Sequence, residues 1–418
     1  MNKRLTYVYL DYECDEPCLV GRLWSHWRNQ KKSASFEYDK SWLNFPNKFS
    51  LEPLLQLTEG VFHTGAGKEL FGAIGDSAPD RWGRILMRRA VSNEAKAEGK
   101  ISHALSEVDY LLMVNDESRQ GALRFKGAEG GVFLSGKNSV PIPPLVELPR
   151  LLDVTEKLLN DEESSNDLKY LLAPGSSLGG ARPKASVKDN RGNLLIAKFP
   201  HKNDEFKTVL WEAVALTLAK KAGINTTEWR ICTIAGKKVI LLKRFDRIGE
   251  KRIPFLSAMS MLNTVDNEDH SYLEIVDAIR QYGAKPKEDI SQLWRRIVFS
   301  ILISNTDDHL RNHAFLYENQ HGWRLSPAYD INPVPVEISP RILSTAIDLD
   351  DRTASLALVL SVAKEFGLTN SEAVKIATEV GKAASTWRKV AVKIGIHKQE
   401  IDSMASAFEH EDLQLAIG

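Results

Sequence analysis

The chain has 418 residues, 43% of them hydrophobic, and its 55 Lys and Arg balance 55 Asp and Glu. At about 150 residues per domain, it should fold into two or three domains with real cores and without a dedicated nucleic-acid surface. No apolar run reaches the roughly 20 residues that are needed to cross a bilayer, and the first residues do not resemble a signal peptide. The sequence has only three cysteines, and this small, odd number argues for free thiols in a reducing cytoplasm.

The first third of the chain is expected to form a mixed α/β module. Residues 5–10 and 18–23 have the composition of strands, and the three prolines in residues 137–144 suit a connecting segment before a helix over 148–159. We therefore predict a module over 1–125, a smaller lobe over 126–248 and a mainly helical lobe over 249–418. The helical lobe should contain helices near 272–282, near 293–304 and through most of 354–408.

A glycine-rich loop follows at 175–184, between the expected helix and a pair of strands. Glycine lets backbone N–H groups approach phosphates closely, and residues 185–188 and 194–199 are expected to form strands joined by a turn. The loop is not a Walker A motif, because Ala181 and Arg182 stand where that motif has Lys and Ser or Thr. A surface turn would explain the glycines alone, so they are weak evidence by themselves.

Lys198 strengthens the case for a nucleotide site. It lies within an apolar strand, where an ammonium group needs anionic partners. Residues 206–221 have helical periodicity, and Glu212 on this helix could pair with Lys198 as a strand lysine and a helix glutamate do in protein kinases. The alternative is a snorkelling edge-strand lysine and a solvated glutamate.

A second strand pair is expected at 229–234 and 238–243. In a two-lobed kinase, the strand after the Lys and Glu elements leads into a hinge whose backbone meets the adenine edge. Lys243, Arg244 and Phe245 are therefore the hinge candidates.

The segment 305–330 carries the chemistry of phosphoryl transfer. An apolar helix over 293–304 leads to Asp307 and Asn312, whose D-x-x-x-x-N spacing is that of a phosphotransferase catalytic loop. Residues 313–317 and 323–325 should form a hairpin that brings Asn312 and Asp330 together as oxygen ligands for Mg²⁺. The alternative is that Asp307 and Asp308 only cap a turn.

Together these motifs resemble the HipA family of bacterial serine/threonine kinase toxins, over nearly the whole chain. Segments 176–184, 306–312 and 325–330 resemble its phosphate loop, catalytic loop and metal-binding segment. Segments 36–42, 77–83 and 121–125 resemble its additional N-terminal subdomain. The resemblance implies an α+β, two-lobed, protein-kinase-like fold with an extra N-terminal mixed α/β subdomain and an α-rich C-terminal lobe.

The resemblance also implies residue roles. Asp307 would be the catalytic base, Asn312 and Asp330 would bind Mg²⁺, and Lys198 would bind the α- and β-phosphates of ATP. Asp308 stands where family members often have Gly, and it could add metal affinity or compete as the base, although the spacing to Asn312 favours Asp307. Further nucleotide contacts and supporting residues would be Gly179, Gly180, Ala181, Lys184, His309 and Tyr329.

Ser177 is implied to be a site of autophosphorylation that switches the enzyme off, with Ser176 as a less favoured neighbour. A phosphoserine adds about −1.5 to −2 charges where the ATP phosphates must lie, so repulsion would oppose nucleotide binding. The alternative is that both serines only shape the turn.

The preferred function is a cytoplasmic toxin kinase that phosphorylates a protein Ser or Thr, with an aminoacyl-tRNA synthetase as the implied substrate. Its implied partner is a HipB-like helix-turn-helix antitoxin, through which alone it would associate with DNA. A small-molecule phosphotransferase shares the D-x-x-x-x-N pattern, but it would not need the N-terminal module. A non-catalytic partner of a DNA-binding protein predicts a damaged site, whereas Asp307, Asn312, Asp330 and Lys198 are all present.

Overall fold

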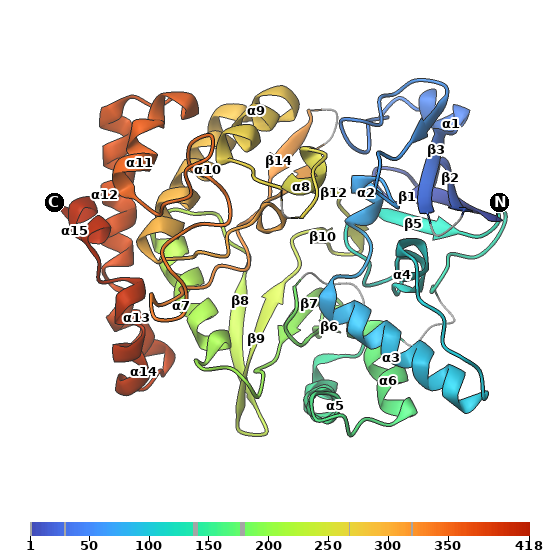
Figure 1. Cartoon of the computed structure of the whole chain (residues 1–418), viewed down its shortest axis with the longest axis horizontal. Coiled ribbons are helices and arrows are strands. Elements are labelled where there is room, and N and C mark those ends of the chain that lie inside the picture. Colours follow the sequence, from blue (N-terminus) through green and yellow to red (C-terminus); the bar gives the residue numbers. More distant parts are fainter. Residues whose placement is uncertain (1, 29–30, 137–140, 176–179, 267, 319–320) are drawn as a thin grey trace. The chain divides into compact units, whose positions relative to one another are not determined.

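The computed structural model describes residues 2–28, 31–136, 141–175, 180–266, 268–318 and 321–418. The chain divides into two compact units (Figure 1). Unit 1 comprises Met1–Lys202 and Cys232–Leu256, and unit 2 comprises Asn203–Ile231 and Ser257–Gly418. The threefold division made from the sequence stays a prediction. Among the described residues, no helix has the length and apolar character needed to span a membrane.

A five-stranded sheet forms the first part of unit 1. Its strand order is β4-β3-β2-β1-β5, and β1 pairs antiparallel with both β2 and β5. Val8, Leu23 and Phe36 are fully buried beneath it, as expected for strands with one face on a core. The elements are β1 Asn2–Leu10, β2 Cys18–Arg28, β3 Lys31–Tyr38, β4 Val61–His63 and β5 Leu123–Lys126, with helices α1 Lys40–Leu43, α2 Gly72–Gly75, α3 Arg81–Ala97 and α4 Glu107–Met113.

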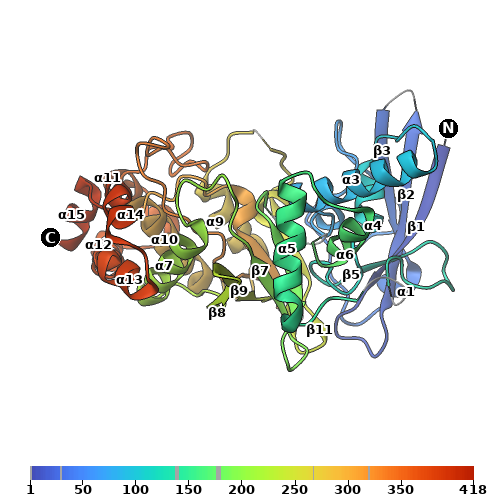
Figure 2. The same cartoon turned by 90° about the horizontal axis from the view of Figure 1, so that it is seen from below.

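The second sheet of unit 1 carries the end of the glycine-rich loop. Its order is β6-β7-β9-β8, with β6 Lys184–Lys188, β7 Leu194–Lys198, β8 Trp229–Ile234 and β9 Lys237–Lys243, so both predicted strand pairs are confirmed. Figures 1 and 2 show α5 Leu148–Leu159 and α6 Ser165–Gly175 beside these strands, and α3 packs against α6. Apolar side chains of the three helices share one core with the sheet. The remaining short elements here are η1 Leu145–Glu147, β10 Arg247–Ile248 and β11 Lys251–Arg252, and β12 Phe255–Ser257 begins in unit 1 and ends in unit 2.

Unit 2 is mainly helical, as the sequence predicts for the C-terminal part. Helix α7 Thr208–Lys221 packs against α12 Asn370–Ala384 and α13 Trp387–Ile394, and α10 Pro286–Leu302 packs against α9 Tyr272–Tyr282 and α12. The rings of Trp387 and Phe408 stack with centroids 4.5 Å apart in this helical core. The remaining elements are α8 Ala258–Met261, η2 Leu310–Asn312, β13 Ala314–Tyr317, β14 Trp323–Leu325, α11 Leu356–Ser361, η3 Ala363–Phe366, α14 Lys398–Ser403, η4 Ala405–Ala407 and α15 Glu411–Ile417.

The cysteines near the N-terminus differ from expectation. The sequence favoured free thiols at Cys14 and Cys18, whereas the structure joins them in a disulfide across the loop between β1 and β2. The four-residue separation allows this because the loop returns the chain to the neighbouring strand. The cysteine content therefore no longer supports a reducing compartment.

Candidate active site

Helix α10 delivers the candidate catalytic loop. The predicted apolar helix over 293–304 is confirmed and begins earlier, at Pro286, where a proline is tolerated because the first helical N–H has no intrahelical acceptor. Trp294, Ile297 and Ile301 are fully buried, so the helix is fixed in the core of unit 2. The loop that follows therefore starts from a rigid element.

The two adjacent aspartates of this loop have opposite environments. Asp307 is exposed, whereas only 4% of Asp308 is accessible to solvent. Partial desolvation raises the pKa of Asp307; the positive charge of His309 opposes this shift, and the negative charges of Asp330 and Asp308 add to it. Asp307 is thus an accessible carboxylate with increased basicity, which suits a general base.

Asp308 makes its contacts inside unit 2. The hydroxyls of Tyr272 and Ser300 donate hydrogen bonds to its carboxylate over 2.7 and 3.0 Å, and His313 Nε2 lies 3.0 Å from it. The sequence left open a metal-binding or basic role for Asp308. Because this carboxylate is buried among three side chains, its environment is that of a supporting residue.

Asn312 and Asp330 lie on the two sides of the predicted hairpin, which is confirmed by the pairing of Phe315 with Leu325 in β13 and β14. Asn312 Nδ2 donates to the carbonyl oxygen of Asp307 over 3.0 Å, so the amide oxygen is the end available to a cation. Asp330 has a φ of 54°, a left-handed conformation that is uncommon outside glycine. Ser304, which precedes the catalytic loop, has a similar φ of 51°.

The donor set near Asp307 suits Mg²⁺, which prefers oxygen ligands and usually takes only one or two carboxylates together with phosphates and water. The negative charge of Asp330 contributes to the raised pKa of Asp307, and a nearby divalent cation would favour the charged form of a carboxylate. Among the described residues there is no group of three or more His, Cys, Asp or Glu side chains arranged around a metal position. Asp330 and Asn312 offer one carboxylate and one amide oxygen, a donor set that fits a Mg²⁺ ion shared with phosphates and water.

Other predicted residues brace the same loop. The backbone N–H of His309 donates to the carbonyl oxygen of Asp307 over 3.0 Å, and the Tyr329 hydroxyl donates to the carbonyl oxygen of Arg311 over 2.6 Å. The chain just after the segment 325–330 is joined to the loop where Asn332 N–H donates to Asn305 Oδ1 over 3.1 Å. The supporting position of Tyr329 thus has a structural basis.

The glycine-rich loop is described only at its two ends, and Ser176, Ser177 and Gly179 lie outside the described residues. Gly180 has a φ of 93°, which favours glycine, and Ala181 is exposed. At the other end, a Cβ on Gly175 would come within 2.5 Å of a Leu86 side-chain carbon and 3.2 Å of Trp82 Nε1. A larger residue at this position would have to displace the buried side chains of Leu86 and Trp82 on helix α3.

Helix α3 also holds the C-terminal end of this loop. The Asp80 carboxylate accepts a hydrogen bond from Gly180 N–H, and the Trp82 indole donates to the carbonyl oxygen of Lys184 over 2.9 Å. Asp80 and Trp82 belong to the segment 77–83, which the sequence assigned only to the N-terminal subdomain. No local pattern predicts these contacts, because about a hundred residues separate their partners.

Lys184 and Lys198 face each other directly in the antiparallel pair of β6 and β7. Side chains at such positions share one face of the sheet, so the two lysine side chains start from the same face. Lys184 is only 3% exposed, and Lys198 is half-buried. Glu212 is buried on α7 in unit 2, and its pairing with Lys198 in unit 1 stays a prediction.

The predicted hinge residues have different surroundings. Lys243 is exposed at the end of β9, and Phe245 stacks on Phe255 with ring centroids 6.5 Å apart. Arg244 is 4% exposed, and its backbone N–H donates to the carbonyl oxygen of Leu194 over 3.2 Å. Any contact of Arg244 with an adenine ring would therefore have to come from its carbonyl oxygen, not from its side chain.

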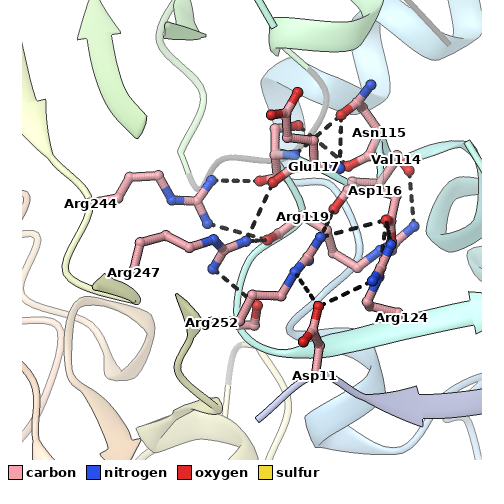
Figure 3. Close-up of polar contacts among 12 residues, drawn as sticks. Asp11, Val114, Asn115, Asp116, Glu117, Arg119, Arg124, Arg244, Arg247 and Arg252 are labelled. Carbon is pink, nitrogen blue, oxygen red and sulfur yellow. Dashed lines mark hydrogen bonds and ion pairs between the residues drawn. The ribbon is translucent and has the colours of Figure 1, made fainter. Parts of the chain in front are cut away.

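The side chain of Arg244 belongs to a buried arginine cluster of unit 1. Figure 3 shows Arg244, Arg247 and Arg252 reaching toward the segment 114–119, and Arg244 Nη1 donates to the carbonyl oxygen of Ser118 over 2.5 Å. Burial raises the pKa of Asp246, but Arg244 and Arg247 outweigh this effect and hold that pKa well below its usual range. The cluster ties β9 and β10 to the loop before β5, which is a structural role.

Comparisons with known proteins agree with this architecture. Residues 176–387, just over half of the chain, match the model of the HipA-like C-terminal domain. The chain is 25% identical over 198 residues to a Haemophilus influenzae protein named "Putative kinase", covering 41% of this chain and 56% of that protein. A Sinorhizobium fredii protein named "Putative kinase Y4dM" is 26% identical to this chain over 133 residues, which cover 29% of this chain and 32% of that protein. The matches thus span about half or less of the length of these curated relatives.

A solved structure provides the comparison of the fold. The Shewanella oneidensis HipA in a complex with HipB and operator DNA superposes with a TM-score of 0.66 at 16% identity, covering 99% of this chain and 96% of that one. This likeness confirms the expected α+β HipA-like fold. With the family model matched across the glycine-rich loop, the catalytic loop and the helices beyond them, the chain belongs to the HipA-like C-terminal domain family.

Proposed function

We propose that this protein is an ATP-dependent serine/threonine kinase that acts as the toxin of a toxin–antitoxin module. The observation that carries the proposal is the arrangement of the catalytic loop. Asp307 is exposed and has a raised pKa, Asp330 is close enough to contribute to that shift, and Asn312 is fixed to the Asp307 backbone. Membership in a family with relatives named as kinases gives the arrangement its context.

In the proposed reaction, Asp307 orients the acceptor hydroxyl and takes its proton. The acceptor oxygen forms a bond to the γ-phosphorus of ATP while the bond from that phosphorus to the bridging oxygen breaks, and ADP leaves with the bonding electrons. The raised pKa of Asp307 favours proton transfer compared with an ordinary aspartate. Most of the rate would come from positioning and electrostatic stabilisation.

The proposed nucleotide contacts come from the glycine-rich loop, from strands β6 and β7, from the residues after β9 and from the segment 305–330. Bound Mg²⁺ would neutralise phosphate charge, and Asn312 and Asp330 are its proposed protein ligands. Lys184 and Lys198, which are opposite each other on β6 and β7, would be the cationic groups that contact the phosphates. The glycine-rich loop, with Gly179, Gly180 and Ala181, would cover them, and Lys243 and Phe245 remain the candidates for the adenine contact.

Regulation and partners are proposed from the family. Phosphorylation of Ser177, or less favourably of Ser176, would place negative charge where ATP phosphates bind and switch the enzyme off. The Shewanella HipA structure contains HipB and operator DNA, and we propose a HipB-like helix-turn-helix antitoxin as the partner here, with DNA contacted through it. The proposed substrate is a protein serine or threonine, with an aminoacyl-tRNA synthetase as the candidate.

The test is intact-mass spectrometry with phosphosite mapping after incubation of the purified chain with Mg-ATP, beside Asp307→Asn. One added phosphate on Ser177 in the wild type, absent in the variant, is the expected result. A phosphate that appears equally in both proteins would reject Asp307 as the base. Nucleotide binding without transfer to the chain or to any protein of a bacterial lysate would reject the kinase proposal.

A further inference from the structure

We propose that Asp308 is a positioning residue that fixes the catalytic loop so that Asp307 faces the acceptor hydroxyl. The effect of Asp308 on catalysis rests on the proposed kinase function, whereas the anchoring of the loop by the Asp308 side chain does not. It assigns the second carboxylate of the Asp307–Asp308 pair to a task other than metal binding or proton transfer.

The first support is the set of elements that meet at the Asp308 side chain. Tyr272 begins helix α9, Ser300 lies in the last turns of helix α10, and His313 precedes strand β13. Their polar atoms lie 2.7, 3.0 and 3.0 Å from the carboxylate oxygens. One side chain thus connects the loop to two helices and to the hairpin that carries the proposed metal ligands.

The second support is the backbone on both sides of Asp307. Thr345 Oγ1 donates to the carbonyl oxygen of Asp308 over 2.7 Å, and Ser344 N–H donates to the carbonyl oxygen of Thr306 over 3.0 Å. The carbonyl oxygen of Asp307 itself accepts from the Asn312 side chain over 3.0 Å. Three consecutive carbonyl groups are therefore bound, and in this stretch the exposed side chain is that of Asp307.

The third support is the electrostatic setting of a small pocket behind the loop, which Arg296, Ser300, Asp308 and His313 help to line. Burial of Asp308 raises its pKa, but the imidazole of His313 and the hydrogen bonds to the carboxylate outweigh it, so the net pKa is lowered. The charge of the buried Arg296 also interacts with Asp308. An ionised anchor is stronger than a neutral one, because hydrogen bonds to a charged acceptor contribute more.

The decisive variant is Asp308→Asn, which keeps the shape of the side chain and removes its charge. We expect the rate constant of self-phosphorylation to fall by about 10- to 100-fold, because a displacement of about 1 Å at a reacting group can cost this much. The ATP concentration for half-maximal rate should stay within about twofold. Tyr272→Phe and Ser300→Ala, which each remove one anchoring bond, should give smaller losses in the same direction. Adding Tyr272→Phe to Asp308→Asn should cost little more, since both act through one contact.

Glu52→Gln is the matched control. Glu52 is also a buried carboxyl, 2% exposed, but it lies in unit 1 and accepts a hydrogen bond from Ala73 N–H over 2.6 Å. This variant should keep the wild-type rate. A folded Asp308→Asn protein with a wild-type rate would overturn the proposal, and so would one whose main defect is a rise in the required Mg²⁺ or ATP concentration.

Hydrogen exchange separates this inference from the kinase proposal. Backbone amides of residues 304–313 should exchange faster in Asp308→Asn than in the wild type, with the control variant unchanged in this segment. Unchanged exchange in Asp308→Asn would refute the anchoring role even if the wild type were fully active. A wild type without phosphate transfer but with the expected exchange difference would reject the kinase proposal and keep Asp308 as the anchor.

Discussion

The catalytic loop and the glycine-rich loop are both held by residues distant in sequence, but by different chemistry. The catalytic loop is anchored from inside unit 2 by a buried ionised carboxylate, Asp308, and by bonds to consecutive carbonyl groups. The glycine-rich loop is anchored in unit 1 at its two ends. There, Trp82 packs near Gly175 and donates to the carbonyl oxygen of Lys184.

This difference matches what each loop is proposed to do. A base must hold its position relative to the acceptor hydroxyl within a fraction of an ångström, whereas a phosphate-binding loop can adjust as long as its ends are fixed. Changes to the first set of anchors should therefore lower the rate of transfer. Changes to the second set should mainly weaken nucleotide binding, and the variants below test that separation.

The largest effect is expected from removing the group that the catalytic loop presents. Asp307→Asn should lower the rate of phosphate transfer by about 10²- to 10⁴-fold, the usual contribution of a general base. Its nucleotide affinity, measured by titration calorimetry with ATP and Mg²⁺, should stay within a fewfold of the wild type. A variant that retains more than a tenth of the rate would remove Asp307 from the role of base.

The next largest effect concerns the lysines opposite each other on β6 and β7. Lys198→Met and Lys184→Met should each weaken ATP binding by about 10- to 100-fold, because a hydrogen bond to a charged group contributes roughly 1.5–3 kcal/mol. Lys188→Met is a matched control on the same strand, since Lys188 lies at the far end of β6 and pairs with Glu117. Equal affinities of all three variants for ATP would show that the paired lysines do not meet the phosphates.

The buried carboxyl group of Glu52 in unit 1 offers a test of stability that does not depend on the proposed activity. Burial raises the pKa of Glu52 from 4.5 to about 7; the hydrogen bond from Ala73 N–H opposes this shift, and Asp76 adds to it. The folded state therefore binds more protons than the unfolded state between these values, so this group's contribution to stability is present at pH 4.5 and is lost as the pH rises through 7.

Glu52→Gln should remove that dependence. Relative to the wild type, the variant should gain up to about 3 kcal/mol of unfolding free energy between pH 4.5 and 7, at about 1.4 kcal/mol per pKa unit. Urea denaturation at several pH values would measure it. A constant difference between the two proteins across this range would contradict the raised pKa.

Much of the fold could be predicted from the sequence because its signals are local. Alternating apolar residues and the turn at 189–192 indicated β6 and β7, and the five-residue spacing of Asp307 and Asn312 indicated the catalytic loop. Helix α6 was missed, because the polar stretch 160–166 concealed its start and Pro174 lies near its end.

The anchors of the site could not be predicted, for a physical reason. Whether Asp307 or Asp308 faces solvent depends on which helices lie behind the loop, and Tyr272 is 36 residues away from its partner Asp308. Spacing favoured Asp307 for the catalytic role, but it carried no information on what buries Asp308. In the same way, the segment 77–83 was recognisable as a motif, while its contact with the glycine-rich loop depends on tertiary packing.

The smallest effect tests that last contact. Trp82→Phe removes the indole hydrogen bond to the carbonyl oxygen of Lys184 and keeps most of the buried ring. A lost hydrogen bond of about 1 kcal/mol corresponds to roughly a fivefold weaker nucleotide affinity if the bond orders the loop, with the maximal rate of transfer unchanged.

Trp42→Phe is the control, because Trp42 is equally buried in unit 1 but its indole N–H has no hydrogen-bond partner among the described residues. If Trp82→Phe lowered the maximal rate as strongly as Asp308→Asn, both loops would serve the same step and the division between them would fail. A selective loss of ATP affinity in Trp82→Phe alone would give the N-terminal segment a direct part in nucleotide binding.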